Sequence, residues 1–311
     1  MINVEGLTHF YGEHRAIEGL GFQIAEHEIV GFLGLNGAGK STTLKILAGL
    51  VVPSAGSVSI DGVDLVSAGA DFRSRIGYLP EDPPLYREMT VREFVSYCGQ
   101  LKGMPAADVE RRLDPVLAVT QLTHVQHRVI AELSHGYKKR VGIAQAIVHK
   151  PRLVILDEPI SGLDPRQIVE MRQVIRNLAQ DCTVLISSHI LAEISETCDR
   201  ILVLAGGRIV AQGTEAELGE RAGADGARLT LIVRGHPDRV DAAVLELATR
   251  ISHDKREEGD GTWRLHVALA TDDREALVAS LVKHGVGVRK LIEDESELEQ
   301  IFLGLTKEAM A

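Results

Sequence analysis

The first two thirds of the chain alternates between short apolar runs and stretches in which apolar residues recur at helical spacing. The stretch IVGFLGLNGAGKSTTLKILAGL (29–50) passes from an apolar run through glycines into a helical pattern, which predicts strand, loop and helix. RLVILDEP (152–159) and CTVLISSH (182–189) have the continuous apolar core of strands buried on both faces of a parallel sheet. The repeated order of strand, helix and strand predicts an α/β fold with a mostly parallel sheet covered by helices.

Turn and capping signals place several connections between these elements. SVSIDGVDL (57–65) alternates and turns at its Asp-Gly pair, and RILVLAGGRIVAQG (200–213) turns at its Gly-Gly pair, so both stretches predict hairpins. Thr90, followed three positions later by Glu93, forms a capping-box pattern. It predicts a helix that runs to about Lys102.

A change in composition divides the chain. Residues 219–227 are rich in Gly and Ala, and we expect a linker there between a domain at 1–218 and a second at 228–311. The second domain shows the order β-α-β-β-α-β plus a terminal helix, which is ferredoxin-like. Its expected strands are 228–235, 251–257, 262–270 and 286–292, and its expected helices are 238–250, 273–285 and 296–306.

Composition indicates the cellular compartment of the protein more clearly than its function. The 311 residues include 34 basic and 44 acidic ones, a net charge of −10, so we expect no nucleic-acid partner. Three distant cysteines show neither metal-ligand spacing nor a disulfide framework, which favours a reducing cytoplasm. The N-terminus has no signal-peptide pattern, and no apolar run reaches the length of about 18 residues that a membrane span needs.

The strongest chemical signal is GLNGAGKST (34–42), which matches the pattern G-x-x-x-x-G-K-[ST] between a predicted strand and a predicted helix. Glycines let the backbone fold so that its N–H groups face a phosphate. Lys40 would place a point charge on the β- and γ-phosphates, and the Ser41 hydroxyl would bind Mg²⁺.

The strand ending in LVILDE (153–158) supplies two acids. We expect Asp157 to hold Mg²⁺ and Glu158 to orient and deprotonate an attacking water. Taken alone, two solvated acids that cap a strand would explain the pair equally well. Together with the phosphate loop, they favour a nucleotide-hydrolysing site.

A second anion site is suggested by LSHGYKKR (133–140), where Ser134 and Gly136 stand at the start of a predicted helix. Taken alone, a plain N-capped helix is the better explanation of this short pattern. The three cations that follow, at 138–140, either add positive field or form a solvated face, and the solvated face is favoured.

Over about residues 1–215 the sequence resembles the ATP-binding subunit of ABC transporters, with the motifs in the family's order. The resemblance implies a P-loop NTPase fold of ABC type, with an antiparallel β subdomain and a helical subdomain. It implies that Tyr11 stacks on adenine, with Phe10 as the competing aromatic and strand packing as the alternative role. LSHGY resembles the family's LSGGQ segment, and His189 resembles the switch histidine, although a structural histidine at a strand end is the alternative.

Further site residues follow from the same resemblance. Glu81, in GYLPED, stands where the family usually has Gln, and its carboxylate would also suit Mg²⁺. Asp164 belongs to the SGLD segment, the D-loop. The expected nucleotide contacts are Tyr11, Asn36, Gly37, Ala38, Gly39, Lys40, Ser41, Thr42, Glu81, Ser134, Gly136 and Asp164; the expected metal ligands are Ser41, Glu81 and Asp157; the expected catalytic residues are Lys40, Glu158 and His189.

In this family two ATPase domains close head to tail, with ATP between the phosphate loop of one and the LSGGQ segment of the other. The resemblance therefore implies a second copy of the subunit and a separate integral membrane permease, with this chain peripheral on the cytoplasmic face of the membrane. GYLPE looks like an exporter branch that includes gliding-motility and copper-processing ATPases. His135 and Tyr137 depart from LSGGQ, which puts the nucleotide contacts there in question.

Two other functions compete with transport. ABC-type ATPases that act on DNA carry a long coiled coil between the two motifs, whereas Lys40 and Asp157 lie only 117 positions apart. Those that act on ribosomes usually hold two ATPase domains in one chain, and this chain has one. A degenerate regulatory module is the other alternative, and the intact Lys40, Asp157, Glu158 and His189 argue against it.

The expected permease groove is the segment 83–95, in which Tyr86, Met89 and Phe94 would form an apolar floor, although Phe94 fits its own helix core equally well. The acids and histidines beyond 228 show no ligand spacing. We interpret them as solvated faces and helix N-terminal acids. A regulatory or dimer-stabilising role of this domain is a hypothesis.

Overall fold

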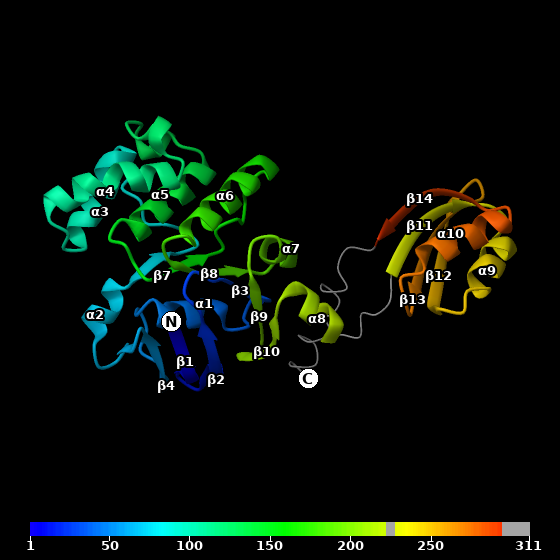
Figure 1. The fold of residues 1–311 in the computed structure, drawn as a ribbon, viewed down its shortest axis with the longest axis horizontal. Helices are drawn as coiled ribbons and strands as arrows, with labels where there is room; N and C mark the ends of the chain where they lie inside the picture. The colour runs from blue at the N-terminus through cyan, green and yellow to red at the C-terminus, as the bar shows by residue number, and fades with distance from the viewer. Residues whose placement is uncertain (222–227, 294–311) are drawn as a thin grey trace. The chain divides into compact units, whose positions relative to one another are not determined.

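The computed structural model describes residues 1–221 and 228–293, which form two compact units. The first unit spans Met1–Thr214 and the second begins at Glu215 (Figure 1). Helix α8 (Glu215–Arg221) occupies the start of the expected linker, and residues 222–227 lie outside the described part. None of the described helices is both long and apolar enough to cross a bilayer.

A six-stranded sheet forms the centre of the first unit, in the order β10-β9-β3-β8-β7-β6. All neighbours are parallel except the β9–β10 hairpin. The mostly parallel sheet and this hairpin are therefore confirmed. The strands are β3 (Ile29–Gly34), β6 (Ile76–Leu79), β7 (Leu153–Asp157), β8 (Thr183–Ser188), β9 (Arg200–Ala205) and β10 (Arg208–Gly213).

A second, antiparallel sheet in the order β2-β1-β4-β5 shares a hydrophobic core with the first. The expected hairpin at 57–65 is the pair β4–β5. This core holds both ends of the loop that follows β3, because Phe32 of β3 and Leu44 of the next helix are both buried in it. The strands are β1 (Ile2–Tyr11), β2 (His14–Ile24), β4 (Ala55–Ile60) and β5 (Val63–Asp64), and the helices are α1 (Lys40–Leu47) and α2 (Gly69–Ser74).

Three helices, α3 (Val91–Leu101), α4 (Ala106–Val119) and α5 (His135–Ile147), gather at one end of the unit, beyond α2 in Figure 1. The expected capping box is present, because Thr90 N donates to Glu93 Oε2 at 2.8 Å and Glu93 N donates to Thr90 Oγ1 at 3.3 Å. Short 3₁₀ turns at Thr123–Val125 and Ile130–Glu132 lead into α5. Helices α6 (Pro165–Leu178) and α7 (Leu191–Ser195) follow β7 and β8.

The second unit is a four-stranded antiparallel sheet in the order β12-β13-β11-β14, with two helices and its own core. The order β-α-β-β-α-β with this strand arrangement confirms the ferredoxin-like prediction. The predicted helix 238–250 is too long, because α9 ends at Leu245 and Arg250 already pairs with Leu269 in the sheet. The elements are β11 (Arg228–Arg234), α9 (Pro237–Leu245), β12 (Arg250–Gly259), β13 (Thr262–Leu269), α10 (Arg274–Lys283) and β14 (Gly287–Glu293). The expected helix 296–306 lies outside the described residues.

Candidate active site

The loop between β3 and α1 has the backbone shape that its glycines predict. Gly37 and Gly39 have φ values of 86° and 101°. A Cβ on Gly39 would lie 2.7 Å from Ile17 Cγ2 and 2.9 Å from the Ala16 carbonyl oxygen. Any other residue at Gly39 would therefore push the loop off β2. Because α1 starts at Lys40, its first N–H groups and the positive end of its dipole point into this loop.

Lys40 is buried, and its ammonium lies inside the loop. Its Nζ donates to the carbonyl oxygens of Gly34 at 2.5 Å and Leu35 at 3.4 Å, and lies 4.0 Å from Glu158 Oε1. Burial lowers the pKa of Lys40, and the nearby charges of Glu158, Asp157 and Glu81 oppose that shift. The ammonium is thus a desolvated cation that a phosphate group can bind strongly.

A cavity of about 240 Å³ opens at this loop. Tyr11 forms part of its wall, is about half exposed, and packs edge-on against His9 with ring centroids 4.6 Å apart. Phe10 is also exposed but is absent from the lining, since neighbouring residues of a strand face opposite sides. Ala38 is buried and does not line the cavity either. The lining residues are Tyr11, His14, Ala16, Leu35, Asn36, Gly37, Gly39, Lys40, Ser41 and Thr42.

Glu158 lies just beyond the end of β7, beside Lys40. His189, which follows β8, places its Nδ1 3.1 Å from both carboxylate oxygens of Glu158. Burial raises the pKa of Glu158, and the His189 contact and the Lys40 charge only partly oppose it. A carboxylate with a raised pKa is a stronger base than an exposed one, which suits the removal of a proton from water.

The backbone of Glu158 is held in an unusual conformation. Its φ is 49°, in the left-handed region that residues other than glycine seldom adopt. Its N–H donates to Ser187 Oγ at 3.0 Å, and the Ser187 hydroxyl in turn donates to Asp157 Oδ1 at 2.5 Å. Its carbonyl oxygen accepts from Lys139 Nζ at the same time. β8 and α5 therefore fix the position of the two acids jointly.

The solvated face expected for residues 138–140 is wrong for two of the three. Lys139 and Arg140 are only 2% and 3% exposed. Lys139 reaches the Glu158 carbonyl, and Arg140 pairs with Glu170 of α6. The helical spacing carried the signal, since Lys139 lies three positions after the buried Gly136 and four before the buried Ile143.

The start of α5 leaves the Ser134 side chain outside the helix cap. Ser134 is the N-cap residue and is exposed, yet its side chain makes no capping hydrogen bond. Ser134 therefore occupies the N-cap position, as the plain explanation has it, but its hydroxyl does not cap the helix. Gly136 is buried against α6, because a Cβ there would lie 2.5 Å from Gln167 Oε1. Asp164 caps α6 by accepting from Gln167 N at 2.9 Å.

The phosphate loop and the start of α5 are not joined. Among the described residues, no hydrogen bond or ion pair links Ser134, Gly136 or Asp164 to the loop, and none of the three lines its cavity. Glu81 is exposed, but its negative charge acts on both Lys40 and Lys139. The sites thus form two groups, one around Lys40 and Glu158 and one at the start of α5.

Tyr137, where the resemblance leads one to expect Gln, packs back toward the other helices. Its hydroxyl lies 2.9 Å from His124 Nε2, and the Arg140 guanidinium lies over its ring at 5.3 Å. In the neighbouring segment, Phe94 is buried and Tyr86 is exposed above it, with ring centroids 6.0 Å apart. Phe94 therefore belongs to the core, and only Tyr86 of this pair is presented on the surface.

Sequence analysis missed several residues that shape the site. Ser187 and Lys139 hold the two acids, and His14 and Ala16 form part of the cavity wall. The Ser-Ser pair before His189 was a usable signal for Ser187, because parallel strands end at the same sheet edge. The contribution of β2 to the cavity had no local signal, since it depends on how the two sheets pack.

Residues 17–161 match the protein family described as "ABC transporter". The chain is similar to the bacitracin transport ATP-binding protein of Bacillus licheniformis, 33% identical with 98% of this chain and 97% of that protein covered. It is also similar to the daunorubicin resistance ATP-binding protein of Streptomyces coeruleorubidus, at 32% identity, covering 98% and 95% of the two chains. Among solved structures, an ATP-binding subunit of an ABC transporter shares 35% identity with a TM-score of 0.64, covering 72% of this chain and 94% of the other.

Proposed function

Because this chain belongs to the ABC transporter family as one of its ATP-hydrolysing, ATP-binding subunits, we propose that it powers an exporter through a separate membrane permease. The observation that carries the catalytic assignment is the group of Lys40, Glu158 and His189, in which a buried carboxylate contacts an imidazole and lies 4.0 Å from the loop lysine. The proposed direction is supported by relatives named for bacitracin transport and for linearmycin and daunorubicin resistance. The comparisons offer no support for action on DNA or ribosomes.

In the proposed site, ATP stacks on Tyr11 and places its phosphates in the loop. Asn36, Gly37, Ala38, Gly39 and Thr42 contribute through the backbone and side chains of the loop and the start of α1. Lys40 would bind the β- and γ-phosphates. Glu158 takes the proton of the attacking water, and His189 orients Glu158 through its Nδ1 contact.

The proposed metal ion is Mg²⁺, which prefers oxygen ligands. Asp157 and Glu81 offer carboxylates, and Ser41 offers a hydroxyl on the cavity wall. Asp157 is steadied by the Ser187 hydroxyl, which leaves its second oxygen for a cation. When bound, the ion would neutralise negative charge on the phosphates.

Subunits of this family dimerise and work with permeases. We assign the start of α5, with Ser134 and Gly136, to the nucleotide held by a second copy, because within one chain this group is not joined to the phosphate loop. Asp164, at the start of α6, would line the same interface. A two-fold arrangement then gives two complete sites. The proposed location is the cytoplasmic face of the membrane, against a permease that contacts the surface around Tyr86.

Two finer assignments rest on the sequence. GYLPE, with Glu81, supports the exporter branch that includes gliding-motility and copper-processing ATPases. The domain division at 1–218, 219–227 and 228–311 is our proposal, and the separate core of the second unit supports it.

The test is to compare the wild type with Glu158→Gln. We expect hydrolysis to fall by about 10²–10⁴-fold, because a positioned base contributes that much, while ATP binding persists. Lys40→Ala should instead weaken nucleotide binding, since it removes charge from the ground-state phosphate site. Affinity purification of Glu158→Gln from solubilised membranes with Mg-ATP should recover a permease with many spans. Normal turnover by Glu158→Gln would disprove the base assignment, and recovery of ribosomes or DNA alone would disprove transport.

A further inference from the structure

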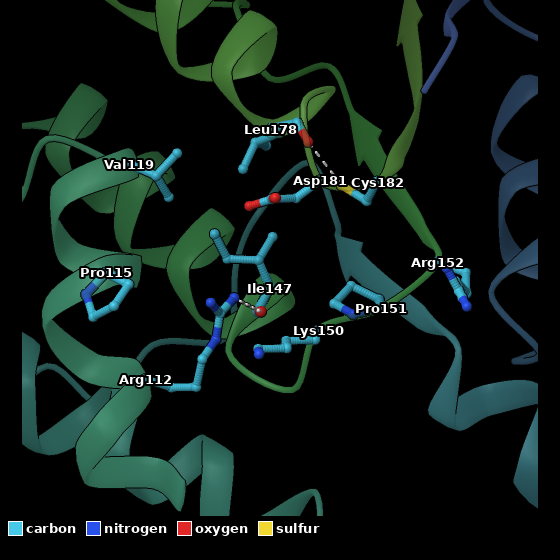
Figure 2. Close-up of a pocket in the computed structure, with 10 residues that line it drawn as sticks. All are labelled: Arg112, Pro115, Val119, Ile147, Lys150, Pro151, Arg152, Leu178, Asp181 and Cys182. Atoms are coloured by element: carbon cyan, nitrogen blue, oxygen red, sulfur yellow. Dashed lines mark hydrogen bonds between the residues drawn. The ribbon is translucent and has the colours of Figure 1, made fainter. Parts of the chain in front are cut away.

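A cleft of about 470 Å³ lies in the first unit, away from the phosphate loop (Figure 2). Its walls come from the ends of α4, α5 and α6 and from the segments that enter β7 and β8. Lys150, Pro151 and Arg152 precede β7, whereas Asp157 ends it. A five-residue strand, roughly 17 Å long, therefore separates the cleft from the catalytic edge, and a ligand here would not displace ATP.

The charge of the cleft is opposite to that of the chain. Three basic side chains, Arg112, Lys150 and Arg152, line it against one acid, Asp181, although the whole chain carries a net charge of −10. Figure 2 shows Arg112 and Lys150 projecting into the space below Ile147, with Arg152 at the far end beyond Pro151. Such a concentration of one sign in a concave site attracts anions.

Two of the three cations form no ion pair with an acid among the described residues. Within residues 1–221 and 228–293, neither Arg112 nor Lys150 forms an ion pair, whereas Arg152 lies 3.5 Å from Asp61. In the part of the chain that the structure describes, Arg112 donates only to the carbonyl oxygens of Ile147 and Val148, both at 3.4 Å, the long limit of such bonds. These two bonds help to cap α5 but leave donors of the guanidinium unused. Burial lowers the pKa of Arg112, and Asp181 opposes that shift, so the cation is partly desolvated.

Much of the remaining lining is apolar. Pro115 and Val119 of α4, Ile147 of α5 and Leu178 of α6 face the same space. Cavities of about 300–1,000 Å³ with an apolar lining and a few convergent polar groups are typical sites for small organic ligands. A bare inorganic anion would leave these apolar side chains in contact with water. An uncharged apolar compound would leave Arg112 and Lys150 without a charged partner.

We propose that this cleft binds an organic anion with an apolar body, its acid group held by Arg112 and Lys150 and its body packed against Val119, Ile147 and Leu178. The acid group is a carboxylate or a group of similar charge. Such a ligand has two sources, a fatty acid from the membrane or a soluble aromatic acid. The inference is independent of the transport assignment, because it concerns binding alone.

The experiment is calorimetric titration of the full chain with decanoate, below its micelle concentration, and with 1-naphthoate, in saturating Mg-ADP. We expect one saturable site per chain for at least one of the two acids. Decanoate alone indicates a fatty-acid source, and 1-naphthoate alone indicates an aromatic acid. Decanol, which has the tail without the charge, and inorganic phosphate, which has the charge without the tail, should each bind much more weakly.

Variants locate the site. Arg112→Gln and Lys150→Gln should each weaken binding about tenfold, because each removes a charge-assisted contact. Arg111→Gln is the matched control, since Arg111 lies on the same helix, is 77% exposed and is not in the lining. Arg112→Lys should retain most of the affinity, and the exposed Lys150 provides a variant with little risk to folding.

Three results would overturn the proposal. They are the absence of saturable binding by both acids, equal binding of decanol or inorganic phosphate, and unchanged affinity in the double variant Arg112→Gln, Lys150→Gln. None of them would affect the assignment of Glu158 or Lys40. Loss of hydrolysis in Glu158→Gln, in turn, says nothing about this cleft, so the two proposals fail separately.

Discussion

At the scale of single residues, Lys139 connects α5 to the backbone of Glu158, the residue proposed as the base, in its own chain. Its ammonium is buried and donates to the carbonyl oxygen of Glu158, a residue with a left-handed backbone. The charges of Glu158 and Glu81 favour the ammonium, while burial lowers its pKa. The start of α5 is proposed to face the second copy's nucleotide, so this contact links the two half-sites of each chain.

Lys139→Met should lower kcat for ATP hydrolysis by about tenfold, because a lost hydrogen bond to a buried carbonyl costs about 1–3 kcal/mol, and leave KM nearly unchanged. The carbonyl of Glu158 would lose its donor, and the carboxylate would be positioned less well. The measurement is steady-state hydrolysis together with nucleotide affinity.

The control is Lys138→Met, since Lys138 Nζ donates to the exposed Ala131 carbonyl instead. Lys139→Arg should recover part of the rate, and thermal melting shows whether each variant is folded. A rise in KM at unchanged kcat would show that Lys139 acts on nucleotide binding and not on Glu158.

His149 should make stability depend on pH. Burial, with the charge of Lys102 next, lowers its pKa from 6.5 to about 4, although a contact to the Ile76 carbonyl opposes this. Between those values the unfolded chain binds a proton that the folded chain does not, so the free energy of unfolding falls as pH decreases from 6.5 toward 4. Above pH 6.5 His149 is neutral in both states, and its full contribution to the free energy of unfolding is retained.

His149→Gln should flatten that pH dependence. The slope of the free energy of unfolding against pH should decrease by at most about 1.4 kcal/mol per pH unit. Chemical unfolding at several pH values between 4 and 7 gives the slopes. His236→Gln is the control, because the His236 side chain is 65% exposed. Equal slopes in the wild type and His149→Gln would contradict the prediction.

Part of the candidate site could be predicted from the sequence alone. That Lys40, Asp157, Glu158 and His189 lie close together was predictable, because their motifs have fixed spacing and the strands that carry them end at the same edge of one sheet; their roles stay predictions. The burial of Lys139 was not, because three consecutive cations are more often solvated. Its helical position was visible, but its partner, a backbone carbonyl 19 residues away, was not.

At the scale of elements, α3 supports the surface proposed to receive the permease. Its capping box satisfies two backbone N–H groups, and Phe94 of its first turn is buried below the exposed Tyr86. Thr90→Ala should lower the free energy of unfolding by about 1 kcal/mol, as the loss of an N-cap does. Ser96→Ala, in the middle of the same helix, is the control. Denaturant unfolding measures both, and equal stability of the two variants would show that the cap contributes nothing.

Element boundaries were predictable where a local signal marks them. The capping box gave the start of α3, and the two glycine-containing turns gave the hairpins β4–β5 and β9–β10. The end of α9 was not predictable, because apolar spacing continues through Leu247, which packs against the second core without being helical. Tertiary pairing of Arg250 in the sheet decided that boundary.

At the scale of the whole molecule, the two units have separate hydrophobic cores. The residues proposed for ATP chemistry lie in the first, and groups of three or more acids, histidines and cysteines with metal-holding geometry are absent from the described residues of either unit. The order of elements in the second unit was predictable, since each carries its own alternating or helical pattern. Its role was not, because no motif there fixes a chemistry.

Deleting residues 220–311 tests that role. The truncated chain retains all of the first core, so it should fold and hydrolyse ATP. If the second unit stabilises the dimer, ATP-dependent dimerisation of the truncated Glu158→Gln variant should need about tenfold more protein, or about 1.4 kcal/mol. Sedimentation equilibrium with Mg-ATP gives the dimer dissociation constants of the full-length and the truncated Glu158→Gln proteins. If the second unit is regulatory, its deletion should change the amount of substrate transported per ATP hydrolysed, measured with the permease. Unchanged dimerisation, hydrolysis and transport would remove both roles, and the second unit would then have to act on something other than the ATPase cycle.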